Sequence, residues 1–367
     1  MKLLRAISIL AGSLMLTHGA VAQLSITPPA EKAAEKAEKR SEKPVEKPAE
    51  KAKAKPPAKK PAEKPGDKPA NAKAEPVPSA TPTPAPDDPN VDLVYGAYQR
   101  GQYKTAFDLA TTRAQDGDIR AMTMLGELYS GGLGIKRDYA KADDWYRRAS
   151  DGGDREAMFA LAMMKLAGRG GTVDKPEAVK LLASSAKLGE AKAAYNLALL
   201  YLDGQTLPQD LRRSAELLRQ AADAGNPEAQ YALATFYKEG TGVEKDVEKS
   251  VRLLQAASLA GNVDAEVEYA IALYNGNGTP RNQPAAIALL RKASKQNSPI
   301  AQNRLARVLL LGLNSSSDDK IEGMKWHWVA KTAGKGDPEL DEAVSKLTPE
   351  EHNKGEEASR RWLGGPK

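Results

Sequence analysis

The sequence predicts an all-α solenoid of repeated helix pairs, and two spacings carry that prediction. An alanine recurs every 36 residues in six copies, and a glycine follows each of them eleven residues later. A fixed period of this length indicates one supersecondary unit that buries its apolar face only by stacking on its neighbours. The alanines are Ala121, Ala157, Ala193, Ala229, Ala265 and Ala301, and the glycines are Gly132, Gly168, Gly204, Gly240, Gly276 and Gly312.

The first helix of each unit, helix A, is predicted around the alanine. The fourth and fifth residues after it are large and then small, as in Leu197 and Ala198, which places both on one helical face. Three residues before the alanine stands an Asp, Asn or Ser that can cap the helix, with Glu190 as the exception. The glycine at offset eleven from the alanine is expected to end helix A with a positive φ in all six copies.

A second helix, helix B, is predicted from offset 17, where every copy has Asp or Asn. Its packing positions are those of Leu217 and Ala221 in the third unit, and a glycine ends it in four units. In the sixth unit Asp318 stands at offset 17, and Trp326 takes a packing role one residue late. One residue is therefore inserted in the sixth loop, around 314–317, where an insertion costs little.

The ends of the array depart from the pattern, as terminal repeats must. Residues 91–117 are predicted to form a degenerate first unit, six units follow from residue 118 and the solenoid extends to residue 336. Residues 337–367 are predicted as capping helices and a tail. Asp337 and Pro338 begin one helix, and Thr348 opens a last helix that runs to about Trp362.

The N-terminal residues 1–22 have the pattern of a cleavable secretory signal. A short basic stretch precedes an apolar run over 7–16, and small residues favour cleavage after Ala22. The mature protein is therefore expected in the periplasm or outside the cell. The apolar run is shorter than the roughly 20 residues of a spanning helix, so we expect no membrane span once the protein is mature. The chain has no cysteine, which excludes disulfides and cysteine metal sites.

Residues 23–90 are predicted to be a disordered tether of Lys, Ala, Glu and Pro, because such a composition has little apolar surface to bury. Fifteen of the 24 prolines favour an extended polyproline II-like chain, and a short helix over 31–43 is an alternative. Residues 31–76 hold 14 Lys and Arg against 9 Asp and Glu. The positive charge fits an anionic envelope surface better than nucleic acid, which would need a basic groove on the folded part. A solvated spacer is the simpler interpretation.

The first complete unit resembles the Sel1-like repeat, a relative of the tetratricopeptide repeat. The resemblance rests on Ala121, Leu125, Gly126, Tyr129, Gly132, Gly134, Asp138, Ala142, Trp145, Tyr146 and Ala149. It covers about residues 91–336 and implies a right-handed superhelix of helix pairs that serves protein–protein interaction. Exported members of this kind include periplasmic regulators that restrain a membrane sensor kinase. The expected partner is therefore an envelope protein, such as a membrane sensor or an assembly factor.

The resemblance implies a non-enzymatic adaptor that needs no cofactor or metal. Only three histidines occur, and no cluster offers the ligands of a zinc site. The S-x-x-K spacing at Ser184 and Lys187 lacks the accompanying motifs of serine β-lactamases. The alternative is a secreted repeat protein that binds or hydrolyses β-lactams or peptidoglycan fragments. The family members linked to that activity carry cysteine pairs, which this chain lacks.

The candidate protein-binding residues lie at offsets two and six of helix A. By analogy with tetratricopeptide arrays, helix A lines the concave face of the solenoid. The middle of this face is apolar and its ends are charged, which suits a peptide or helix anchored by a few buried side chains. The alternative is that the offset-two rings only pack between units. The predicted residues are Phe159, Met163, Tyr195, Leu199, Tyr231, Thr235, Ile271 and Arg307.

Overall fold

The computed structural model describes residues 92–312 and 315–364, and every regular element in these two stretches is an α-helix. The all-α solenoid predicted from the 36-residue period is confirmed in this part of the chain. The predicted signal, the predicted tether and the alternative helix over 31–43 lie outside the described residues.

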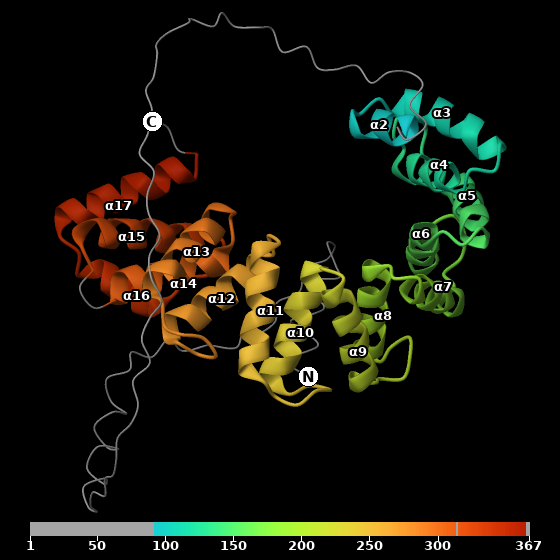
Figure 1. The fold of residues 1–367 in the computed structure, drawn as a ribbon. Helices are drawn as coiled ribbons and strands as arrows, with labels where there is room; N and C mark the ends of the chain where they lie inside the picture. Colours follow the sequence, from blue (N-terminus) through green and yellow to red (C-terminus); the bar gives the residue numbers. More distant parts are fainter. Residues whose placement is uncertain (1–91, 313–314, 365–367) are drawn as a thin grey trace, which may run out of the picture. The chain divides into compact units, whose positions relative to one another are not determined.

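Each unit contributes one helix A and one helix B, which follow one another in chain order (Figure 1). The A helices are α4 (Ile119–Gly131), α6 (Arg155–Ala167), α8 (Ala191–Asp203), α10 (Pro227–Glu239), α12 (Val263–Asn275) and α14 (Pro299–Leu311). The B helices are α5 (Tyr139–Asp151), α7 (Lys175–Lys187), α9 (Leu211–Asp223), α11 (Val247–Leu259), α13 (Gln283–Lys295) and α15 (Ser317–Thr332). The pair α2 (Leu93–Gln99) and α3 (Tyr103–Gln115) precedes them, and α16 (Pro338–Ser345) and α17 (Pro349–Trp362) follow.

The core runs along the array because from α2 to α15 each helix packs on the next one in the chain, whereas α16 packs on α14 and α17 on α15. One apolar cluster joins Leu182 of α7, Leu218 of α9 and Phe236 of α10, all with no exposed surface. The small residue at offset five is needed for this packing. At Gly126 an added Cβ would lie 2.5 Å from the ring of Tyr146, so the first unit accepts no larger side chain there without repacking.

The predicted caps of the A helices are in place. Asp118, for example, accepts hydrogen bonds from the amides of Arg120 and Ala121 at 2.9 and 3.2 Å. The expectation that Glu190 is an exception is wrong, because its longer side chain still accepts from the amide of Lys192 at 3.3 Å. A glutamate therefore serves as the cap of α8.

The turn of the sixth unit differs from the other five. The glycine at offset eleven has a positive φ of 64° to 78° in five units, but Gly312 is extended at φ −68° and ψ 146°. The expectation of six left-handed glycines is therefore wrong for the sixth. Helix α15 is capped by Ser316, with Asp319 completing a capping box, rather than by Asp318. Helix α15 has 16 residues against 13 in each other B helix and begins two offsets earlier. The extra residue therefore lies in a longer helix and not in the loop, where it was expected.

In four of the six units a second glycine, at offset thirteen, positions the turn against the preceding unit. Gly134, Gly170, Gly242 and Gly278 all have a positive φ. At Gly242 an added Cβ would lie 2.2 Å from the carbonyl oxygen of Leu211, at the beginning of the preceding helix B. Only glycine allows this approach of two backbones. The third and sixth units depart from the rule, with Thr206 and Asn314 at this offset.

The C-terminal helices close the array through aromatic contacts. Helix α17 packs on α15, where the rings of Trp326 and Trp362 meet edge to face at 4.9 Å. The ammonium of Lys325 lies 4.2 Å from the Trp326 ring centre and 4.5 Å from that of Trp362. No helix within 92–312 or 315–364 combines the length and the apolar character needed to cross a bilayer.

Candidate protein-binding face

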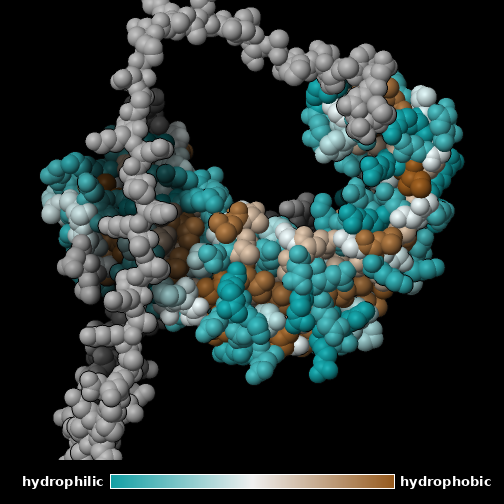
Figure 2. All heavy atoms as spheres, in the orientation of Figure 1, coloured by the Kyte–Doolittle hydropathy of each residue, from teal (hydrophilic) through white to brown (hydrophobic). Residues whose placement is uncertain are grey.

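The predicted binding residues lie on five successive A helices. Phe159 and Met163 are on α6, and the offset-two and offset-six residues of the next three units follow on α8, α10 and α12. Hydrophobic residues are prominent on the surface over the middle of the array, between ridges of hydrophilic side chains (Figure 2). We name the surface formed by the residue before the repeat alanine and by offsets two, three and six of α4 to α12 the A-helix face.

These side chains differ in exposure. Met163 is the most open at 37 %, and most of the others are half-buried. Tyr195 is only 8 % exposed, and its hydroxyl has no hydrogen-bond partner in the described part of the chain. The A-helix face therefore consists of side chains that are fixed by packing but still present part of their surface.

The offset-two rings do pack between units. Tyr231 of α10 lies against a cluster that includes Leu254 of α11 and Ala265 of α12, so its ring touches its own unit and the next one. Phe159 packs in the same way against the large central cluster. Packing between units is thus an observed role of these rings, and ligand contact stays a prediction.

Carboxylates of the following unit lie near the two tyrosine rings. Burial and the nearby carboxylate of Glu228 raise the pKa of Tyr195 to about 12. Burial, Glu268 and Asp264 raise the pKa of Tyr231 further. The pKa of Asp264 is itself raised, because its carboxyl is partly desolvated and faces Glu268. Negative charge therefore accumulates beside the rings of α8 and α10.

A cavity of about 440 Å³ opens on the A-helix face between the first and second units. Three carboxylates line it, from Glu127, Glu156 and Glu190, together with the ammonium of Lys192 and the ring of Phe159. The Tyr98 hydroxyl donates to Glu127 Oε1 at 2.8 Å, and burial and this carboxylate raise the pKa of Tyr98 to about 12. The cavity thus joins a predicted ring to an excess of negative charge.

Arg307, the last of the predicted binding residues, is paired with carboxylates of the same chain. Its guanidinium pairs with Asp337 at 2.9 Å and with Glu339 of α16 at 2.5 Å. Asn303, the offset-two residue of the same helix, donates to Asp337 at 3.2 Å. In the sixth unit these two offsets therefore fasten the C-terminal cap instead of presenting a free surface.

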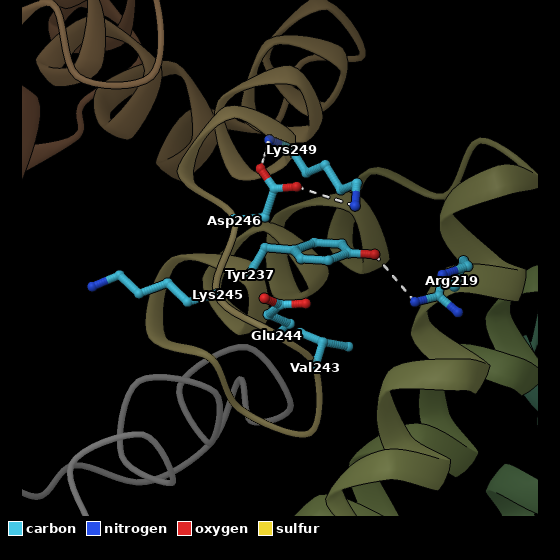
Figure 3. A pocket seen from close by; sticks show the side chains of 7 residues that line it. All are labelled: Arg219, Tyr237, Val243, Glu244, Lys245, Asp246 and Lys249. Atoms are coloured by element: carbon cyan, nitrogen blue, oxygen red, sulfur yellow. Dashed lines mark hydrogen bonds and ion pairs between the residues drawn. The ribbon is translucent and has the colours of Figure 1, made fainter.

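A second cavity of about 440 Å³ lies beside the turn between α10 and α11 (Figure 3). Two contacts join its polar side chains. Lys249 lies 3.1 Å from Asp246, and Arg219 donates to the hydroxyl of Tyr237 at 3.1 Å. The sequence did not predict this cavity.

The residues considered for catalysis have structural roles. Ser185, beside the S-x-x-K match, has no exposed surface and donates to the carbonyl of Arg155 at 2.7 Å. His327 is also fully buried, with Nε2 2.7 Å from Asp341. In residues 92–312 and 315–364 no three His, Asp or Glu side chains come close enough to hold a metal ion.

The Sel1 repeat family matches the chain six times in succession, over residues 119–154, 155–190, 191–226, 227–262, 263–298 and 299–327. These boundaries follow the 36-residue period. No curated protein sequence matches the chain.

Two solved structures share the fold. A Sel1 repeat protein from Oxalobacter formigenes is 23 % identical, with a TM-score of 0.58, over 65 % of this chain and 98 % of that one. A protective antigen of uropathogenic Escherichia coli with an SLR fold is 25 % identical, with a TM-score of 0.63, over 74 % of this chain and 60 % of that one. Together with the six matches, they show that the chain belongs to the Sel1 repeat family, whose helical solenoid is generally a scaffold for protein–protein interaction.

Proposed function

We propose that this protein is a non-enzymatic adaptor that binds another envelope protein through its A-helix face. One observation carries the proposal: three successive units present a half-buried or buried ring at offset two, on Phe159, Tyr195 and Tyr231. Aromatic side chains that are already held by packing lose little freedom on binding and are typical anchors of interfaces. The contrast with Arg307, which is paired within the chain, supports the middle of the array as the binding region.

The N-terminal sequence supports a place outside the inner membrane. Residues 1–22 have the pattern of a secretory signal, and the Lys- and Pro-rich residues 23–90 suit a tether that contacts anionic envelope surfaces. On this proposal the solenoid works in the periplasm or outside the cell, and its partner is a membrane sensor or an assembly factor.

Site-specific photocrosslinking in living cells tests this proposal. A photoreactive amino acid replaces Thr235, a half-buried residue of the A-helix face, and in a matched protein it replaces the exposed Gln255 of α11. We expect the first protein, and not the second, to form one dominant crosslink to another envelope protein. Equal crosslinking from both positions, or from neither, would contradict the proposal.

The alternative of a cell-wall ligand is separated by two direct measurements. An adaptor should give no heat on titration with muropeptides and no turnover of a β-lactam. Saturable heat that disappears in Phe159→Ala would instead assign the cavity between the first two units to a small ligand.

A further inference from the structure

The rings of the A-helix face have carboxylates of the next unit as neighbours. The ring of Phe159 shares its cavity with Glu190, and the other two rings lie near the carboxylates of Glu228 and Asp264. Each of these carboxylates stands at the beginning of the A helix that follows the ring. Glu228 and Asp264 both stand one residue before a repeat alanine, so the repeat places the same combination of ring and negative charge twice. Beside Phe159 that position is Lys192, and the negative charge comes from Glu190, the cap of α8.

Charge is divided between the two kinds of helix. The six A helices hold 7 Lys and Arg against 8 Asp and Glu, whereas the six B helices hold 17 against 10. Helix α12 has three acidic residues and no basic one. Of the cations near the rings, Lys238 is paired with Glu268 at 2.8 Å, Arg155 lies 3.8 Å from Glu190 and Lys192 lines the first cavity. The carboxylates therefore outnumber the cations that face them.

A deeply buried hydroxyl independently indicates a missing partner. Tyr195 is more than nine-tenths buried, and its Oη, which is influenced by Glu228, has no hydrogen-bond partner among the described residues. A buried polar atom without a partner is costly, so a donor that reaches it gains both a hydrogen bond and the nearby negative charge. An ammonium or guanidinium group supplies both requirements.

We propose that the A-helix face from α4 to α12 selects an extended segment of its partner that carries lysine or arginine side chains. Each cation lies against an offset-two ring and pairs with a carboxylate beside it, which is Glu156 or Glu190 at the first ring, Glu228 at the second and Asp264 at the third. This inference rests on the proposed function, because it specifies the chemistry of the partner at the same face. Charge complementarity of this kind sets specificity and speeds association.

Two labelled peptides test the proposal on the mature full-length protein by fluorescence anisotropy. One is a 12-residue repeat of Ala-Lys-Pro and the other a 12-residue repeat of Ala-Glu-Pro, both about long enough to cross several units. We expect saturable binding of the lysine peptide that weakens with salt, and no saturable binding of the glutamate peptide. Equal binding of both peptides, or of neither, would overturn the inference.

Matched triple variants locate the binding. The first removes three A-helix carboxylates by Glu156→Gln, Glu228→Gln and Asp264→Asn, and the second removes three from B helices by Glu216→Gln, Asp223→Asn and Glu248→Gln. We expect the first to weaken lysine-peptide binding by about tenfold and the second by less than about twofold. Tyr195→Phe should weaken it by about threefold without loss of fold. Similar losses in both triple variants would contradict a specific A-helix face.

The photocrosslink at Thr235 separates the two proposals. If the A-helix triple variant still captures the same partner at unchanged yield, the adaptor function stands and the cationic specificity is wrong. If no partner is captured from either position but the lysine peptide still requires the A-helix carboxylates, the cationic specificity stands and the adaptor function is wrong. A crosslink to a second copy of this chain would replace the envelope partner and overturn both.

Discussion

In units two to four, offset two of helix A holds the rings of Phe159, Tyr195 and Tyr231, whereas in unit six it holds Asn303. The rings pack into the junction with the next unit and remain partly open, except for the nearly buried Tyr195. Asn303 instead bonds to Asp337, beside the ion pairs of Arg307. The same positions on the helix therefore end in two different arrangements.

The difference shows which positions of the repeat are constrained. Offsets zero, four and five are buried in all six units except at Tyr269, because they hold helix A against its neighbours. The side chains at offsets two and six lie beside the following unit or, in the sixth unit, beside the C-terminal cap. When a regular unit follows, they form a surface that is partly free, and when the cap follows, they fasten it. Repeats can thus change function at these offsets without a change of fold.

The largest expected effect comes from the turn that seats the fourth unit. Gly242→Val should cost about 3 kcal/mol or more, because it combines a left-handed φ of 64° with a Cβ 2.2 Å from the Leu211 carbonyl. Gly225→Val is the control, since its φ of 84° is also left-handed but no atom lies within 4 Å. Urea unfolding followed by circular dichroism should give Gly242→Val a clearly lower free energy of unfolding than Gly225→Val. Equal stabilities would show that the close approach does not matter.

The second effect concerns the compared positions themselves. Tyr231→Ala should cost about 3 kcal/mol of folding free energy, because a ring that contacts two units leaves a cavity. Asn303→Ala, at the same offset, should cost only about 1 kcal/mol for its single hydrogen bond to Asp337. Partner binding measured on the same Tyr231→Ala protein separates packing from recognition. A variant that is both stable and fully able to bind would show that the face is placed wrongly.

A smaller effect is expected from the ion pairs on the two sides of the comparison. Arg307→Met should cost about 1 to 2 kcal/mol, because Arg307 and Asp337 are 20 % and 12 % exposed and removal leaves the carboxylate unpaired. Lys238→Met breaks the pair with Glu268, whose side chains are 40 % and 26 % exposed, and should cost less than about 1 kcal/mol. Thermal unfolding of both variants provides the check. A larger loss of stability for Lys238→Met than for Arg307→Met would contradict the view that the ion pairs of the sixth unit stabilise the protein more than those in the middle of the array.

The smallest effect is a pH dependence of opposite sign in the two regions. Hydrogen bonds from Lys331 and His327 hold the pKa of Asp341 below its usual value, so its contribution is present above about pH 4 and is lost as the pH falls. The pKa of Asp264 is raised by desolvation and by Glu268, so this carboxyl favours folding at low pH and the gain is lost as the pH rises.

Asparagine variants measured at two pH values check these signs. Asp341→Asn should destabilise the protein at pH 7, and this effect should shrink as the pH falls through the lowered pKa of the native carboxyl, because the carboxyl then becomes protonated as well. Asp264→Asn should stabilise it at pH 7 and lose that advantage at about pH 3. The same sign for both variants at pH 7 would contradict the assignment of opposite environments.

The helices could be predicted from the sequence because their signals are local. The apolar spacing and the capping residues place α4 to α14 without reference to other units. The turns could not be predicted as well, because their conformation depends on contacts elsewhere. Gly312 is extended in a turn that is two residues shorter than those of the other units, and Gly242 is required by the backbone of Leu211 in the preceding unit.

The candidate face was predicted in part. Aligning the units identified the rings at offset two, but the deep burial of Tyr195 and the pairing of Arg307 depend on the unit that follows. The carboxylates beside the rings were missed. A signal for them exists, since Glu228 and Asp264 occupy the same place one residue before successive repeat alanines.

The contact of Gly242 with Leu211 also gives the array a direction. Each such turn rests on the unit before it in the chain. During synthesis the earlier unit leaves the ribosome first, so the seat for a turn is available when that turn emerges. Truncation should be correspondingly asymmetric: removing units from the C-terminus leaves every remaining turn supported, whereas removing them from the N-terminus exposes the first remaining turn.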